Sequence, residues 1–381
     1  MSESKRLVSL DVFRGLTIMS MILVNNPGSW EYVYPPLRHA QWHGWTPTDL
    51  IFPFFLFIVG VAIKLSLDKY LTTEIIMHKI YFRIFKRAIL LFALGLFLNG
   101  FPDFHWGTLR IPGVLQRIAV CYLIASLIYL KIARAEIGKV QVSLLPLFII
   151  IPALLFVYYA LMKFVPVPGF GAGRIDLPAG NLAAWLDKNI FGAHVWQHSR
   201  PWDPEGLLST IPAIATTLSG VVCGWWLKTE REKMDKFVKM MLAGGGCVVL
   251  AYLVHLFFPI NKNLWTSSYV LLTSGLALLI LGICYYYTDV LGKKLGTKPF
   301  IIFGANAITV YFLSSVGADL MSLISVPVGG GSMDVKSFLY YYVFQPPFGN
   351  YLGSLAFAIS YILLWLAVMS VFYKKKVFIK V

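Results

Sequence analysis

Long apolar stretches alternate with short polar ones along the chain. Ten of these stretches come close to the roughly 20 residues that a helix needs to cross the hydrocarbon core of a bilayer. Because the backbone must satisfy its own hydrogen bonds inside lipid, each stretch is predicted to be a helix rather than an open strand. The ten predicted spans are approximately residues 7–26, 48–67, 83–100, 114–131, 141–163, 206–227, 238–258, 267–288, 299–325 and 350–373.

The composition also indicates a membrane protein. Of the 381 residues, 58% are hydrophobic and 13% are charged, whereas a soluble globular chain has about 25% charged residues. A soluble enzyme, a secreted disulfide scaffold and a disordered chain are therefore excluded. The four cysteines fall within apolar stretches and lack metal-ligand spacing, so they are interpreted as reduced packing residues. We expect an all-α fold, a polytopic membrane helical bundle of about ten transmembrane helices, forming a single transmembrane domain over residues 1–381.

The net charge of +15 is typical of a nucleic-acid-binding protein until the charges are placed on the topology. With the N-terminus in the cytoplasm, 24 Lys and Arg residues fall on the inner side of the predicted spans and 9 on the outer side. This asymmetry follows the positive-inside rule and predicts that both termini are cytoplasmic. The basic excess then indicates contact with anionic membrane lipids, and no nucleic-acid partner is expected. The first six residues are too short for the charged region of a cleavable signal peptide, so the first span is expected to remain.

The outer connections are longer than the inner ones, and long loops in a compact protein are usually functional. Eight of the eleven Trp residues lie in these loops or at the outer interface. They are interpreted as an aromatic belt or as platforms for a sugar ring, with Trp42 and Trp45 the better sugar candidates. Segment 336–345 is too short to span and is expected to lie in the interface or to re-enter. The long connections are residues 27–47, 164–205 and 326–349.

Polar residues are densest between Asn25 and Asp49. His39 lies in this proline-rich outer loop, and a His that is oriented by a carboxylate such as Asp49 has the arrangement of a general base. His39 and His43 are four residues apart, which is also the spacing of two metal ligands on a helix. The glycine and proline that follow argue against a helix there, so no metal ion is expected.

Two other clusters carry residues that fit an anionic cofactor. Asp11 and Arg14 are three residues apart on one face of the first span, where they form either a local ion pair or, through Arg14, a cofactor contact. Gln116 and Arg117 follow the sequence Arg110-Ile-Pro-Gly at the outer entrance of the fourth span. Both are expected to face the mouth of the bundle.

Two outer clusters have a structural and a substrate-binding interpretation. Asp203 precedes a proline before the sixth span, so it is predicted either to cap that helix or, with Glu205, to contact substrate. Residues Asn261 to Trp265 form a short outer turn between the seventh and eighth spans. Asn306 lies inside the ninth span, where a buried amide is expected to hydrogen-bond a neighbouring helix.

Six blocks of sequence occur in a fixed order from residue 9 onwards. Together they resemble the heparan-α-glucosaminide N-acetyltransferase family of membrane-embedded acetyltransferases. The set is specific, although any one block alone would be a weak signal. The blocks are SLDVFRG, VNN, HAQWHGWTPTDLIFPFFLFIVG, RIPGVLQR, DPEGLLSTI and NKNLWTSSY.

The resemblance implies that the chain moves an acetyl group from cytosolic acetyl-CoA to the amino group of a terminal glucosamine across the membrane. It places the functional His of the family at His39, its Asn at Asn25 and its Asp at Asp49. His43 stands where the family commonly has Asn, and the N-terminal extension of lysosomal members is missing. These differences indicate a bacterial member in the inner (plasma) membrane with a smaller amino-sugar acceptor. The resemblance also implies a homodimer.

The mechanistic hypothesis makes His39 the general base for the attacking amine, oriented by Asp49. Asn25, or another amide or Trp donor, would stabilise the oxyanion, and a two-step exchange through acetylated His39 is the alternative. The predicted acetyl-CoA contacts are Arg14, Gln116 and Arg117. The predicted substrate contacts are Trp42, Trp45, Asp203, Glu205, Asn261 and Trp265.

Two other functions fit the same topology. A transporter for a sugar or lipid intermediate would also be a bundle with polar mouths, but transporters usually have internal repeats or paired broken helices, and the sequence indicates neither. An O-acetyltransferase of cell-surface polysaccharide would use the same donor with a hydroxyl acceptor. The sequence has no Walker loop, dinucleotide fingerprint, GxSxG elbow or CxxC pair, so it gives no support to P-loop pumps, hydrolases or redox domains.

Overall fold

The chain forms two compact, mostly helical units in a computed structural model that describes residues 7–72, 76–136, 139–329 and 331–379. The first unit comprises Met1–His39, Thr46–Ile51 and Ile283–Val381. The second comprises Ala40–Trp45 and Phe52–Gly282. The six N-terminal residues, which bear on the expectation of an uncleaved first span, lie outside the described residues.

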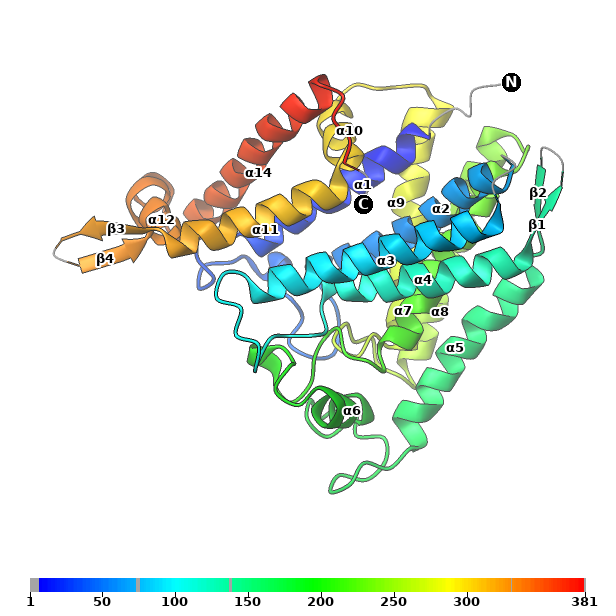
Figure 1. The fold of residues 1–381 in the computed structure, drawn as a ribbon, viewed down its shortest axis with the longest axis horizontal. Coiled ribbons are helices and arrows are strands. Elements are labelled where there is room, and N and C mark those ends of the chain that lie inside the picture. Colours follow the sequence, from blue (N-terminus) through cyan, green and yellow to red (C-terminus); the bar gives the residue numbers. More distant parts are fainter. Residues whose placement is uncertain (1–6, 73–75, 137–138, 330, 380–381) are drawn as a thin grey trace. The chain divides into compact units, whose positions relative to one another are not determined.

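The first unit joins the N-terminal helix to the C-terminal part of the chain (Figure 1). Its α-helices are α1 (Val8–Asn25), α10 (Lys298–Ala305), α11 (Ala307–Leu323), α12 (Val335–Phe338), α13 (Gln345–Phe348) and α14 (Asn350–Lys374). Its shorter elements are the 3-10 helices η1 (Pro35–Leu37) and η2 (Pro47–Leu50), the π-helices η4 (Tyr286–Val290) and η5 (Leu339–Phe344), and strands β3 (Ser325–Val328) and β4 (Gly331–Asp334).

The second unit holds the central helices of the sequence (Figure 1). Its long helices are α2 (Ile51–Thr72), α3 (Met77–Gly100), α4 (Val114–Ile132), α5 (Leu145–Phe164), α7 (Thr210–Lys228), α8 (Lys233–His255) and α9 (Ser267–Tyr285), the terminal residues of α2 and α9 belonging to the first unit. Its short elements are α6 (Leu182–Phe191), the 3-10 helix η3 (Gln197–Ser199) and strands β1 (Ala133–Glu136) and β2 (Lys139–Val142).

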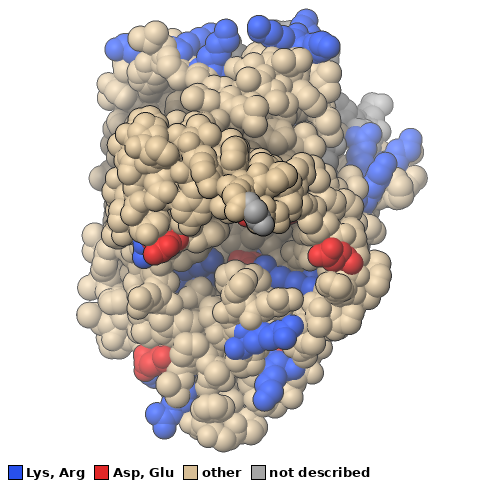
Figure 2. All heavy atoms as spheres, turned by 90° about the vertical axis from the view of Figure 1, so that its left-hand side faces the viewer, with Lys and Arg blue, Asp and Glu red and all other residues tan. Residues whose placement is uncertain are grey.

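Eight of the described helices are long and apolar enough to cross a membrane, or nine if the bent pair α10 and α11 counts as one span. Uncharged side chains cover most of the face in Figure 2, as expected for a surface that meets lipid. The predicted span 83–100 does form a helix, but it is not among the eight. Arg83, Lys86 and Arg87 all lie in the part of α3 that would have to cross. The total of ten spans and the cytoplasmic termini therefore stay predictions.

The predicted continuous span over residues 299–325 is wrong. It divides at Asn306 into α10 and α11, which are bent by 85°. Asn306 has a non-helical backbone (φ −129°, ψ 40°), and its side-chain amide donates to the Val377 carbonyl at 3.1 Å and accepts from the Ile379 N–H at 3.1 Å. The amide therefore holds the segment after α14 rather than a neighbouring helix. The non-helical backbone of Asn306 is the local cause of the sharp bend between α10 and α11.

Two β-hairpins are absent from the sequence-based prediction. β1 pairs with β2 and β3 pairs with β4, each antiparallel and each as a separate two-stranded sheet. Both join successive helices outside the candidate spans. Residues 335–348, which include the segment predicted to be too short to span, form the consecutive helical turns of α12, η5 and α13.

Two glycines allow α1 and α10 to pack backbone against backbone in the first unit. A Cβ added at Gly15 would collide with the carbonyl of Phe300. A Cβ added at Gly304 would collide with the carbonyl of Asp11. Small residues at such a crossing let membrane helices approach closely and gain dispersion contacts that lipid cannot replace.

Gly15→Ala should destabilise the protein by about 1–3 kcal/mol, because the added methyl meets rigid backbone rather than a movable side chain. Thermal unfolding of purified protein in detergent measures the effect. Gly246→Ala in α8 is the matched control, because nothing lies within 4 Å of the new methyl. Since Ala favours a helix over Gly by about 1 kcal/mol, the control should be neutral or stabilising. Equal melting temperatures for the two variants would contradict the close packing.

Candidate functional site

Two short 3-10 helices shape the loop that carries the candidate base. Both η1 and η2 begin at a proline, whose fixed φ suits the first helical position. The backbone N–H of Thr46, just before η2, donates to Oδ2 of Asp49 at 2.9 Å. The Thr46 hydroxyl donates to the carbonyl of Arg38 at 2.6 Å, so the two ends of the loop are tied together.

The structure brings His39 and Asp49 into contact. Nδ1 of His39 lies 2.6 Å from Oδ1 of Asp49, whose side chain is 1% exposed, whereas the His39 side chain is 53% exposed. Because a carboxylate accepts hydrogen bonds, it selects the His39 tautomer with hydrogen on Nδ1 and a lone pair on Nε2. Within the described part of the chain no hydrogen bond engages Nε2. That nitrogen can therefore take a proton from a substrate.

His43 has a different environment, in the second unit. Its Nε2 lies 2.9 Å from Oδ1 of Asp176, and its Nδ1 lies 3.3 Å from Nδ2 of Asn261. Oδ1 of Asn261 accepts from the Leu264 N–H at 2.9 Å, which fixes Nδ2 as the group facing His43. Nδ1 of His43 must then accept and Nε2 must donate. Both ring nitrogens of His43 are hydrogen-bonded, so His43 has no lone pair available to accept a proton, whereas His39 has one on Nε2.

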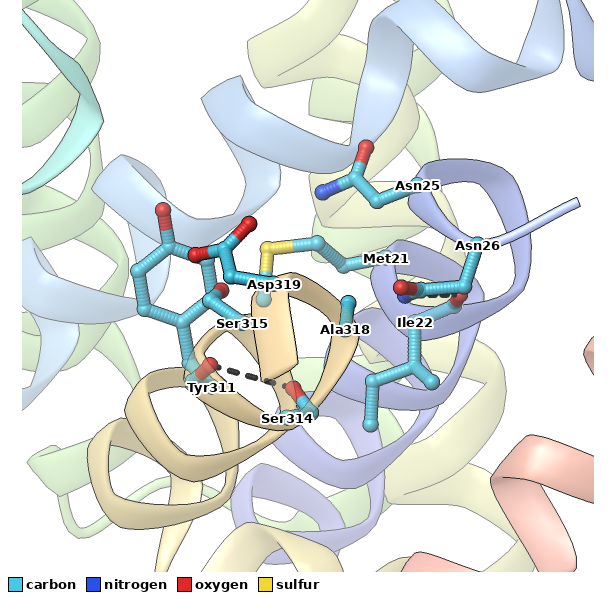
Figure 3. A pocket seen from close by; sticks show the side chains of 9 residues that line it. All are labelled: Met21, Ile22, Asn25, Asn26, Tyr311, Ser314, Ser315, Ala318 and Asp319. Carbon is cyan, nitrogen blue, oxygen red and sulfur yellow. Dashed lines mark hydrogen bonds between the residues drawn. The ribbon is translucent and has the colours of Figure 1, made fainter. Parts of the chain in front are cut away.

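Asn25 is the last residue of α1, in the same unit as His39 and Asp49. Its side chain is exposed and lines a cavity together with residues of α11 (Figure 3). Among the described residues no hydrogen bond to its amide is found, so both its donor and its acceptor are available to a ligand.

The segment with this geometry matches a known sequence family. A family model described as a domain of unknown function, DUF5009, matches residues 6–218, which is more than half of the chain. The chain belongs to the DUF5009 family. It is also 31% identical over 429 residues to heparan-alpha-glucosaminide N-acetyltransferase of Mus musculus, covering 100% of this chain and 61% of the mouse protein. The protein of that name from Homo sapiens is 31% identical over 351 residues, covering 80% of this chain and 52% of the human one.

The chain thus spans about half to three fifths of the length of the curated relatives it matches. The alignments confirm the resemblance that the six sequence blocks indicated. The DUF5009 match includes His39 and Asp49 as well as the acidic segment at Asp203, and it ends before Asn261 and Trp265.

In this DUF5009 chain Asp203 does not lie at the start of α7, where it was predicted to cap the helix. α7 begins at Thr210, after Ser209, so the prediction that Asp203 caps it is wrong. Asp203 instead accepts two hydrogen bonds from the Arg110 guanidinium, at 2.6 and 2.8 Å, and one from the Trp196 N–H at 2.8 Å. Glu205 accepts from the same guanidinium at 2.5 Å. A buried carboxylate near a guanidinium gains more from this charge-assisted bond than from capping a helix seven residues away.

The charges of this cluster are mutually compensated. Burial by itself lowers the pKa of Arg110, but the hydrogen bond to Asp203 and the charge of Glu205 raise it overall. Burial by itself raises the pKa of Glu205, but Lys262, Arg110 and Arg117 lower it overall. Each group therefore stays charged because its partners outweigh the desolvation penalty.

Asp187 on α6 is the third carboxylate of this cluster. Its carboxylate accepts from the Asp203 N–H at 3.1 Å and from the Leu207 N–H at 3.0 Å. Burial raises the pKa of Asp187 to about 6, against the opposing effect of these two backbone bonds. The carboxylate thus holds the backbone of the loop before α7 in place.

The two predicted cofactor contacts on α4 are buried in the second unit. Arg117 donates to the carbonyls of Pro204 and Gly206 at 3.1 and 2.9 Å and to the Ser209 hydroxyl. Gln116 is also buried, and within the described residues its Nε2 has no hydrogen-bond partner. These contacts give Arg117 a structural role. Its contact with an anionic cofactor stays a prediction.

Arg14 in the first unit forms the local ion pair that its spacing indicated. Its guanidinium lies 3.4 Å from Oδ1 of Asp11 and 3.3 Å from the Gly304 carbonyl. The Arg14 side chain keeps 23% of its surface exposed. Of the three predicted cofactor contacts, Arg14 therefore has the guanidinium that a phosphate can most readily reach.

The predicted sugar platforms differ in exposure. Trp42 is half-buried, donates to the Ile175 carbonyl at 2.9 Å and packs edge-on against Trp202 at 5.2 Å. Trp45 is also half-buried and donates to the Tyr252 hydroxyl at 3.3 Å. Trp265 is fully buried and has no exposed ring face, so its contact with substrate stays a prediction. Its turn folds inward, where the indole packs on aromatic rings.

Sequence reasoning missed three acidic residues. Asp176 orients His43, Asp187 holds the loop before α7, and Asp319 lines the cavity beside Asn25. For Asp176 and Asp187 the local sequence carries no signal, because their partners are distant in the chain. Asp319 could have been found, since a carboxylate inside an apolar span marks a functional site by default.

Arg110→Met should destabilise the protein by about 3–5 kcal/mol, because it leaves the buried carboxylates of Asp203 and Glu205 without their counter-charge. Thermal unfolding in detergent tests this prediction. Arg174→Met is the control, since that exposed guanidinium contacts the Phe170 carbonyl rather than an acid, and it should change stability by less than about 0.5 kcal/mol. Similar losses of stability in the two variants would contradict the role of Arg110 as the counter-charge of Asp203 and Glu205.

Proposed function

We propose that this multi-pass membrane chain is an acetyltransferase that moves the acetyl group of cytosolic acetyl-CoA to the amino group of a glucosamine-type sugar on the outer side of a bacterial inner membrane. The names of the two relatives support the reaction and the acceptor class. The observation that carries the proposal is the contact between His39 and the buried Asp49, which leaves Nε2 of His39 available.

The chemistry requires a base because only the free amine attacks a thioester. In the proposed step the amine nitrogen bonds to the thioester carbonyl carbon, and Nε2 of His39 accepts the proton that the nitrogen loses. The amide of Asn25 donates to the oxyanion of the tetrahedral intermediate. When the carbon–sulfur bond breaks, His39 returns the proton to the leaving thiolate of coenzyme A. Asp49 stabilises the imidazolium between these two proton transfers.

The donor needs a contact for its phosphate groups, which an Arg can bind through two parallel hydrogen bonds. Arg14 is the preferred candidate, because its guanidinium is partly exposed whereas that of Arg117 is buried against carbonyls. Asp11 competes for the Arg14 guanidinium, so binding of a phosphate there would displace or share this ion pair.

A sugar transporter is the second candidate, and the 85° bend at Asn306 favours it. Transporters use discontinuous helices to expose backbone groups to a substrate, usually as a corresponding pair in two repeats. In the described part of the chain the bent pair α10 and α11 has no counterpart. The transferase proposal is preferred, because a carboxylate-oriented histidine has a direct use in acyl transfer.

His39→Ala should lower the rate of coenzyme A release by about 10²–10⁴-fold, the usual contribution of a general base. The assay measures free thiol from purified protein with acetyl-CoA and glucosamine. His78→Ala changes an exposed histidine in the first turn of α3 and should keep the wild-type rate. A His39→Ala variant that folds normally and keeps its activity would contradict the proposal.

Asp49→Asn should also lower the rate, by about 10²-fold or more, because an amide no longer imposes the Nδ1–H tautomer or stabilises the imidazolium. The measurement is the same thiol assay, with wild-type retention on gel filtration as the check of folding. Labelled acetyl-CoA distinguishes the two mechanisms in the wild type. Direct transfer leaves no label on the protein, whereas label that disappears in His39→Ala would establish the acetyl-histidine route.

A further inference from the structure

A polar cavity lies between the C-terminal end of α1 and α11 in the first unit. It has a volume of about 170 Å³. Figure 3 shows side chains from both helices around it, with the carboxylate of Asp319 on the α11 side and the amide of Asn25 on the α1 side. Hydroxyl, amide and carboxylate groups therefore converge on a space of limited size.

Some of these polar groups are already satisfied by the protein. The Ser314 hydroxyl donates to the Tyr311 carbonyl at 3.0 Å, and the Asn26 amide donates to the Ile22 carbonyl at 2.9 Å. Three other groups are left over. In the described residues no hydrogen bond or ion pair involves the side chains of Asn25, Ser315 or Asp319.

Among the described residues that line the cavity, Asp319 carries a charge and none is Lys or Arg. Its half-buried carboxylate lies on α11, in the bent apolar helix pair that would count as the ninth span, where an uncompensated charge is costly. A ligand that brings a positive charge would remove that cost. The phosphate groups of coenzyme A would instead add negative charge, so the cavity disfavours the donor.

We propose that this cavity is the binding site for the amino-sugar acceptor, with Asp319 as the counter-ion of its ammonium group. The bound ammonium releases one proton to solvent before the reaction, and the free amine then attacks the thioester while His39 takes the second proton. The carbonyl oxygen of the Asn25 side chain and the hydroxyl of Ser315 bind sugar hydroxyls, which leaves the NH2 group of Asn25 for the oxyanion. This inference rests on the proposed function and names the acceptor site that the function requires. Because Asn25 is also the proposed oxyanion donor, an acceptor bound at Asp319 lies beside the reacting carbonyl.

The ligand chemistry recognised here is a primary ammonium accompanied by hydroxyl groups. An ethanolamine lipid headgroup also carries a primary ammonium, but it has no set of hydroxyls for Asn25 and Ser315. An amino sugar engages all three unsatisfied groups, so it is the preferred occupant. Glucosamine, glucose and ethanolamine then serve as three probes that separate the ammonium from the hydroxyl contributions.

Isothermal titration of the full chain in detergent, without acetyl-CoA, tests the site. Wild type should bind glucosamine more tightly than glucose or ethanolamine. Asp319→Asn should weaken glucosamine binding about tenfold or more, because a charge-assisted bond is lost, and should leave glucose binding unchanged. Asp103→Asn makes the same chemical change on an exposed turn and should bind like wild type.

Ala318→Leu provides a second variant that changes no charge. Ala318 lines the cavity, so a leucine there should fill part of it and weaken glucosamine binding even if Asp319→Asn fails to fold. Ethanolamine binding as tightly as glucosamine, or glucosamine binding that both variants leave unchanged, would overturn the proposal.

Kinetics separate this inference from the proposed function. In an active enzyme Asp319→Asn should raise KM for glucosamine while leaving kcat nearly unchanged, because the residue binds the acceptor rather than moving its proton. An active enzyme whose KM is unaffected by Asp319→Asn overturns the acceptor site and leaves the transferase proposal standing. Glucosamine binding that depends on Asp319 without any release of coenzyme A supports the site and contradicts the transferase.

Discussion

The hydrogen bond between Asp49 and His39 is the interaction on which the proposed chemistry depends. Asp49 is buried and is itself held by the N–H of Thr46, so its carboxylate has little freedom to move. A fixed carboxylate imposes one tautomer on the imidazole and directs the free lone pair of His39 outward. The short 3-10 helices and their prolines matter because they hold this pair in a loop, where a side chain can be both oriented and exposed.

The same requirement, that every buried polar group finds a partner, separates structural from functional residues elsewhere. Arg110 compensates two acids. Arg117 donates through Nη1 and Nη2 to carbonyls and a hydroxyl before α7, and its Nε is buried without a partner among the described residues. These residues keep the second unit folded and have little left for a ligand. The informative groups are those that a ligand can reach and that have no hydrogen-bond partner among the described residues. Nε2 of His39 and the carboxylate of Asp319 are both of this kind.

The two histidines of the first outer loop illustrate how far sequence reasoning extends. Both were candidates on residue type, and a carboxylate ten residues after His39 made it the better one. That partner is local, so the pairing could be predicted. The contrast with His43 could not, because its partners Asp176 and Asn261 are 133 and 218 residues away. Likewise the local sequence predicted that Trp265 lies in an outer turn, and only the tertiary packing shows that its indole is buried.

By itself the sequence determined the membrane class and the positions of most helices, and it indicated Asp49 as the carboxylate that orients His39. Hydropathy and short-range spacing carry that information, because a helix in lipid satisfies its own backbone whatever surrounds it. Tertiary structure alone decided the break at Asn306, the hydrogen bonds that occupy Arg117 and the cavity at Asp319. Each of these depends on which distant groups meet a polar side chain, and no local pattern of residues specifies such a meeting.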